Sequence, residues 1–75
     1  MAERFTEVDR MQLKRLRQEQ ALSLRELARR SGVAYDTINR LELGKQDAQP
    51  RTIRRLAEAL GVEPKELMKR GVGDE

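Results

Sequence analysis

Residues 35–40 hold several side chains that can form directional hydrogen bonds with another molecule. Arg40 can donate two parallel bonds to guanine, Asn39 can pair with adenine or bind a phosphate, and Asp36 can accept a bond from the amino group of cytosine. The same residues also fit a solvated helix surface, because Asp36 and Arg40 have the i, i+4 spacing of an ion pair. Both interpretations can hold together, since such a pair could keep Arg40 in place for a base.

Other chemistry is limited by what the composition lacks. The chain has no cysteine and no histidine, so it cannot build the usual zinc site, a disulfide framework, or a Cys-His or Ser-His nucleophile pair. Carboxylates are present, but they are scattered through charged helical patterns, where a solvated surface is the simpler interpretation. We therefore expect no metal, no cofactor and no enzyme activity.

The elements that carry these hydrogen-bonding residues are predicted to be two helices joined by a short turn. Within LRELARRSGVAYDTINRLEL, residues 24–43, the small side chain of Ala28 permits two steeply crossed helices to approach closely. Gly32 follows the first helix, where the chain must reverse with a positive φ. Ile38 and Leu41 lie one turn apart on the second helix and face back onto the first. This spacing is typical of a DNA-binding helix-turn-helix.

The wider segment 13–68 resembles the Cro and phage-repressor class of helix-turn-helix proteins, often called the Xre family. The resemblance runs in one register through LKRLRQEQALSLRELA, the turn SGV, INRLELGK and RTIRRLAEALGVEPKELM. It implies an all-α, compact five-helix domain like that of lambda repressor, in which the second and third helices form the helix-turn-helix. It also implies a regulator of transcription that binds double-stranded DNA in a sequence-specific way.

By this resemblance, the base-reading positions are Tyr35, Asp36, Asn39 and Arg40, because the second helix of the motif enters the major groove. Tyr35 could instead pack at the rim of the core. Phosphate contacts in the family come largely from helix N-termini and from the loop after the recognition helix. The corresponding residues, each of which could also be a helix cap or a solvated side chain, are Ser23, Leu24, Arg25, Thr37, Lys45 and Arg51.

Three residues depart from the family pattern. Leu24 stands where many relatives have a glutamine that binds a phosphate or supports the recognition helix, and a leucine side chain does neither. Ala34 occupies the N-cap of the third helix, usually Ser or Thr, and the missing hydroxyl costs about 1 kcal/mol of helix stability. Asp47 puts a negative charge in a loop expected to face phosphate. The phosphate anchor must therefore rely on backbone amides or on Arg25.

The resemblance also implies an ion pair between Arg17 and Glu42, which would join the first helix to the end of the third. Removing one partner of a largely buried pair leaves an uncompensated charge and costs about 3–5 kcal/mol. Both residues are therefore assigned to the maintenance of the fold, although Arg17 could also approach a phosphate.

Apolar periodicity predicts five helices and no strand. The first is expected over residues 8–20, the second after a capping box of Ser23 and Glu26, the third over 35–43, the fourth from Pro50 to Gly61, and a short fifth from Pro64. The expected core is aliphatic and includes Leu13, Leu16, Leu27, Ala28, Val33, Ile38, Leu41, Ile53, Leu56, Ala57, Leu60, Leu67 and Met68. Phe5 is expected to cover the core or to contribute to a dimer contact.

Length and termini indicate a single small domain over residues 1–75, with an N-terminal arm at 1–7 and a frayed tail at 71–75. A core of this size is modest, so a dimer would be a natural source of further burial. The N-terminus has no apolar run, so we expect no signal peptide, no membrane span and a cytoplasmic location.

Charge is distributed unevenly along the chain. The net charge of +3 arises from +3 over residues 1–34, +2 over 35–57 and −2 over 58–75. A basic first part suits a surface that faces phosphate, and an acidic last part suits one turned away from it. Charged residues that merely solvate short helices would give a similar composition.

These observations predict a small dimeric repressor or controller protein that acts on a near-palindromic operator. The homodimer contact is expected in the C-terminal part, with Val62, Pro64 and Leu67 at or beside the two-fold axis, unless these residues simply close the monomer core. An antitoxin with a toxin partner fits equally well. A different class of function, favoured by Leu24 and Asp47, is a protein-interaction adaptor that has lost DNA binding.

Overall fold

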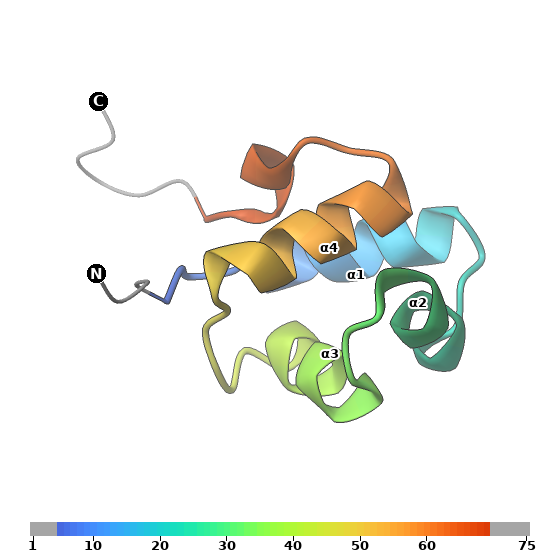
Figure 1. The fold of residues 1–75 in the computed structure, drawn as a ribbon, viewed down its shortest axis with the longest axis horizontal. Coiled ribbons are helices and arrows are strands. Elements are labelled where there is room, and N and C mark those ends of the chain that lie inside the picture. Colours follow the sequence, from blue (N-terminus) through green and yellow to red (C-terminus); the bar gives the residue numbers. More distant parts are fainter. Residues whose placement is uncertain (1–4, 70–75) are drawn as a thin grey trace.

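The computed structural model describes residues 5–69, which form four α-helices and one 3₁₀ turn (Figure 1). The elements are α1 (Arg10–Glu19), α2 (Leu24–Ser31), α3 (Tyr35–Glu42), α4 (Pro50–Leu60) and the 3₁₀ helix η1 (Pro64–Leu67). α2 packs against α3 and α4, α1 packs against α3, and η1 packs against α4 and α1. Figure 1 shows α2 and α3 together on one side of the molecule and η1 on the other. None of the helices within residues 5–69 is long and apolar enough to cross a membrane.

The predicted fifth α-helix is instead the short 3₁₀ turn η1. It ends at Leu67 because Met68 has an extended backbone (φ −97°, ψ 138°) and pairs with Val8 in an antiparallel β-bridge. The same bridge explains why α1 begins at Arg10 rather than at Val8, since Val8 is extended and Asp9 is the N-cap. Met68, expected inside, is 38% exposed.

Side-chain caps form at the N-termini of α1 and α2 but not at that of α3. The Asp9 side chain accepts a hydrogen bond from the Gln12 N–H at 3.2 Å, which caps α1. Ser23 Oγ accepts from the Glu26 N–H at 3.0 Å and caps α2. Only this half of the predicted capping box forms, and the Glu26 carboxylate lies 3.8 Å from Arg29 Nη2 instead. The N-cap of α3, Ala34, makes no side-chain cap, as the sequence predicts.

An aliphatic core joins all of these elements. Burying one leucine or isoleucine side chain contributes about 1.5–3 kcal/mol. Of the residues expected to form the core, Leu16 and Ala28 are only partly buried against it. The buried set is Val8, Leu13, Leu22, Leu27, Val33, Ile38, Leu41, Ala48, Ile53, Leu56, Ala57, Leu60 and Leu67.

The structure differs from the sequence predictions for Phe5 and for part of the N-terminal arm. Phe5 is 60% exposed and therefore does not cover the core. Residues 5–7 of the predicted arm lie within the described part, where Thr6 pairs with Ala48 in a second antiparallel bridge. Residues 1–4 and the predicted tail at 71–75 lie outside the described residues.

Candidate nucleic-acid interface

The turn between α2 and α3 fixes how α3 is presented. Gly32 ends α2 with φ 76°, and its N–H donates to the Ala28 carbonyl at 2.9 Å. The Val33 N–H donates to Ser31 Oγ at 3.1 Å, while the Val33 side chain is buried. α3 then lays Ile38 and Leu41 into the core without measurable exposure. Its opposite face is therefore left to the solvent.

That outer face of α3 carries the predicted base-reading residues. Tyr35, Asp36 and Arg40 are exposed, and Asn39 is half-buried. Within residues 5–69, no ion pair joins Asp36 to Arg40, although their i, i+4 spacing would permit one. The structure thus leaves the hydrogen-bonding groups of Asp36 and Arg40 available to a ligand.

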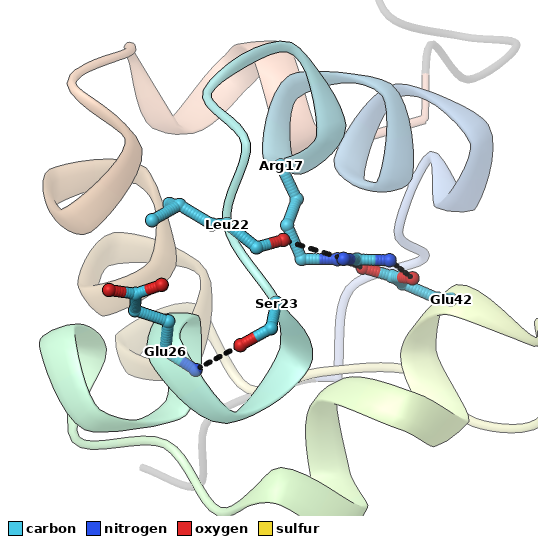
Figure 2. A network of polar contacts seen from close by, with 5 residues as sticks. All are labelled: Arg17, Leu22, Ser23, Glu26 and Glu42. Carbon is cyan, nitrogen blue, oxygen red and sulfur yellow. Dashed lines mark hydrogen bonds and ion pairs between the residues drawn. The ribbon is translucent and has the colours of Figure 1, made fainter.

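The end of α3 is fixed to α1 by the predicted ion pair (Figure 2). Arg17 Nε donates to Glu42 Oε2 at 2.7 Å and Arg17 Nη2 donates to Glu42 Oε1 at 2.9 Å. The two side chains are only 11% and 6% exposed. The hydrogen bond with Glu42 raises the pKa of Arg17 above its ordinary value, although burial acts in the opposite direction, so the guanidinium stays charged at neutral pH.

Arg17 makes a third hydrogen bond that the sequence interpretation missed. Its Nη1 donates to the Leu22 carbonyl at 2.8 Å, in the segment that leads into α2 (Figure 2). A guanidinium has five N–H donors and a carboxylate engages only two of them, so a further acceptor is to be expected for a buried arginine. Sequence spacing does not reveal which carbonyl that is. One side chain therefore sets the position of both the start of α2 and the end of α3.

An open hollow lies where the N-termini of α2 and α3 meet α1. It is lined by Arg17, Ser23, Leu24, Arg25 and Tyr35. Because Ser23 Oγ acts as the acceptor in the helix cap, its hydroxyl hydrogen remains a potential donor. The first backbone N–H groups of a helix have no acceptor within it and carry partial positive charge. This hollow has the donors and the electrostatics that an anion such as a phosphate requires.

The remaining predicted phosphate-contacting residues lie away from this hollow. Thr37 is half-buried on α3, and Lys45 is exposed in the loop after α3. Arg51 is exposed in the first turn of α4, where its Nε donates to Gln49 Oε1 at 3.3 Å. The structure thus brings together Ser23, Leu24 and Arg25, and it places the other three candidates on separate elements.

The predicted dimer residues are not all at the surface. Val62 and Pro64 are half-buried near the start of η1. Leu67 is only 1% exposed, so its side chain belongs to the core of the monomer. The reason is the inward turn of η1, which packs against both α4 and α1.

Comparisons with known proteins agree with this geometry. The helix-turn-helix family model matches residues 13–67. The chain is 45% identical over 58 residues to the HTH-type transcriptional repressor RghR of Bacillus subtilis (strain 168), a match that covers 76% of this chain and 43% of RghR. The chain therefore spans less than half the length of this curated relative.

Solved structures show the same fold. The restriction-modification controller protein C.AhdI from Aeromonas hydrophila superposes with a TM-score of 0.75 and 34% identity, covering 79% of this chain and 89% of C.AhdI. Streptomyces albus HEPD, solved with 2-hydroxyethylphosphonate and Fe(II) bound, gives a TM-score of 0.78 and 28% identity over 93% of this chain but only 16% of HEPD. The matched family model and the shared fold lead to one conclusion: the chain belongs to the helix-turn-helix family.

Proposed function

We propose that this chain binds double-stranded DNA in a sequence-specific way and regulates transcription. The observation that carries the proposal is the outer face of α3, where Asp36, Asn39 and Arg40 offer base-matching groups while the inner face is locked into the core. The second helix of such a motif enters the major groove with its N-terminal residues against base edges. Tyr35, exposed at the first position of α3, is proposed to read bases together with them.

The hollow at the start of α2 supplies the anchor that this docking needs. A phosphate seated there would receive bonds from the Ser23 hydroxyl and from the backbone N–H groups of Leu24 and Arg25. Leu24 is partly buried against the core, so its side chain stabilises the domain, and only its backbone N–H is proposed to bind the phosphate. The absence of a glutamine at this position therefore does not exclude the contact. Thr37, Lys45 and Arg51 are proposed as further phosphate contacts from the flanking elements.

The active form is proposed to be a homodimer on a near-palindromic operator. A two-fold dimer places two recognition helices on one face of the duplex, about 34–36 Å apart. Val62 and Pro64 are half-buried apolar residues at the link from α4 to η1, and Figure 1 shows that link on the side of the molecule away from α3. RghR is described as a repressor and C.AhdI as a controller protein, and either role suits a dimer of this kind. A toxin partner is a further possibility for the same surface.

We do not propose an enzyme activity, because the likeness to HEPD covers only 16% of that protein and supports the fold alone. The second candidate function is a protein-interaction adaptor, favoured by the negative charge of Asp47 in the loop after α3. Leu24 is the other argument for it, because a leucine side chain cannot bind a phosphate as the glutamine of relatives does.

An electrophoretic mobility shift with random-sequence duplex at low and at moderate salt separates the two functions. A DNA-binding domain should shift the duplex at low salt and lose most of that non-specific affinity as salt rises, because binding releases counterions from phosphates. Failure to shift any duplex at low salt would favour the adaptor.

A further inference from the structure

The segment from Thr6 to Asp9 is bonded on both of its edges. On one edge, the Thr6 N–H donates to the Ala48 carbonyl at 2.6 Å, and the Ala48 N–H donates to the Thr6 carbonyl at 3.0 Å. On the other edge, the Asp9 N–H donates to the Leu67 carbonyl at 2.9 Å, and the Lys69 N–H donates to the Glu7 carbonyl at 3.0 Å. Residues 6–9, which we call the strap, thus form the middle of a small three-stranded arrangement.

The strap holds the loop that follows α3. Residues 46–48 of this loop make only two backbone hydrogen bonds with other described residues, and both join Ala48 to Thr6. Ala48 is buried, so this attachment point lies in the core. At the other end of the loop, the side chain of Arg10 lies directly over Gly44, where an added Cβ would come within 2.7 Å of Arg10 Cδ. The Lys45 N–H also donates to the Arg40 carbonyl at 2.9 Å, so α3 and Arg10 hold the near end of the loop and the strap holds its far end.

The charges of the strap argue against a direct contact with phosphate. Glu7 and Asp9 line a hollow together with Asp47 from the loop, and the basic residues Arg10 and Lys69 also line it, so carboxylates outnumber cationic groups there. The Asp9 side chain is engaged as the cap of α1, and Glu7 lies 3.6 Å from Lys69 Nζ. This hollow is a poor site for a phosphate, whereas Lys45 is exposed and has no carboxylate within ion-pair distance in residues 5–69.

We propose that the strap is a positioning element for DNA binding: Thr6, through Ala48, sets the place of the loop so that Lys45 meets a phosphate. The proposal rests on the DNA-binding function proposed above. Without the Thr6 bonds, residues 46–48 would lose their backbone hydrogen bonds, and a phosphate contact from the adjacent Lys45 would carry the entropic cost of ordering them.

Thr6→Pro tests this directly, because proline removes the N–H that donates to Ala48 while an extended residue tolerates its φ. Phe5→Pro is the matched control, since Phe5 donates none of the four strap bonds. The measurement is the slope of the logarithm of affinity for a random duplex against the logarithm of salt concentration. Thr6→Pro should bind roughly tenfold more weakly at low salt and reduce the slope by about one phosphate contact, whereas Phe5→Pro should keep the wild-type slope.

Lys45→Ala identifies the residue through which the strap acts. It should reduce the slope as Thr6→Pro does, and the double variant should show no further loss, because both changes remove the same contact. Circular dichroism should show the wild-type helix content in every variant. A folded Thr6→Pro with the wild-type slope would overturn the proposal, and so would additive losses, which would mean that the strap acts apart from Lys45. If Thr6→Pro does not fold, Thr6→Gly loosens the strap more mildly and should move the slope in the same direction.

Amide hydrogen exchange on the wild-type protein examines the strap without DNA. The amides of Thr6 and Ala48 should be protected to a similar degree, and that of Gln46 should exchange fast. An Ala48 amide that exchanges as fast as that of Gln46 would overturn the strap itself. If both amides are protected but no duplex binds, the proposed DNA-binding function fails, and with it the role of the strap in that function.

Discussion

The guanidinium of Arg17 and the carboxylate of Glu42 form a two-point ion pair, at 2.7 and 2.9 Å, that joins α1 to the last turn of α3. The third bond of Arg17, to the Leu22 carbonyl, lies just before α2. The same side chain also lines the hollow proposed to receive a phosphate. Arg17 therefore bonds both the segment before the proposed phosphate anchor and the end of the proposed reading helix.

Arg17→Ala should lower the free energy of unfolding by about 3–5 kcal/mol, because it leaves Glu42 buried without a partner. Replacing both partners by apolar residues, as in Arg17→Met with Glu42→Leu, should restore much of that loss. Urea denaturation of the single and double variants measures both values. If the free energy of unfolding of Arg17→Ala lay within about 1 kcal/mol of the wild-type value, the ion pair would contribute no more than an exposed pair does.

Ala34→Ser should stabilise the domain, because Ala34 has the extended backbone of an N-cap (φ −60°, ψ 143°) but no side-chain bond. A new cap contributes about 1 kcal/mol, which for a domain of this size raises the Tm by about 4–8 °C. Ser23→Ala is the converse change at a cap that does form, and it should lower the Tm by a similar amount. Thermal melts in which the Tm of both variants changed in the same direction would contradict this account.

Gly44→Ala should destabilise the protein more than Gly32→Ala does. Both glycines have a left-handed backbone, with φ of 73° and 76°, so both substitutions bring a strain of about 1–2 kcal/mol. Only at Gly44 does the new Cβ also meet a neighbour, the side chain of Arg10, whereas Gly32 faces open space. The difference in the free energy of unfolding should disappear in an Arg10→Ala background. If it persists there, contact with Arg10 is not its cause.

Val62→Glu should convert the proposed dimer into a folded monomer, because it places a charge in an apolar contact near η1. Sedimentation velocity measures the change, and operator affinity should fall with it. Gln18→Glu, which adds the same charge on the exposed surface of α1, should leave the dimer intact. If Val62→Glu still sedimented as a dimer, the interface would have to lie on another surface. Exposed Phe5 and α1 would then be the first to test.

Much of this fold could be predicted from the sequence because the deciding signals are local. Gly32 marks the end of α2, Pro50 the start of α4, and Ile38 and Leu41 the buried face of α3. The ion pair of Arg17 and Glu42 was implied by family resemblance rather than by spacing, because its partners are far apart in the chain.

What the sequence did not predict depends on contacts between distant segments. The bridge from Val8 to Met68 shortens the first helix and replaces the fifth α-helix by a 3₁₀ turn. No local pattern at either residue indicates this pairing. The sequence places Leu67 both in the expected core and beside the expected dimer contact, because an apolar side chain in a short helix fits either place. The structure decides for the core, because η1 packs against α4 and α1 and leaves Leu67 only 1% exposed.

The most direct test of the central claim, that α3 reads the DNA sequence, is selection of bound duplexes from a random pool by wild type, Arg40→Ala and Lys45→Ala. Wild type should return a near-palindrome with half-site centres about 34–36 Å apart. Arg40→Ala should relax one base position in each half-site, at a cost of about 1–3 kcal/mol, whereas Lys45→Ala should weaken all sequences alike. If Arg40→Ala lost affinity uniformly and kept the wild-type preference, α3 would not be the reader of the sequence.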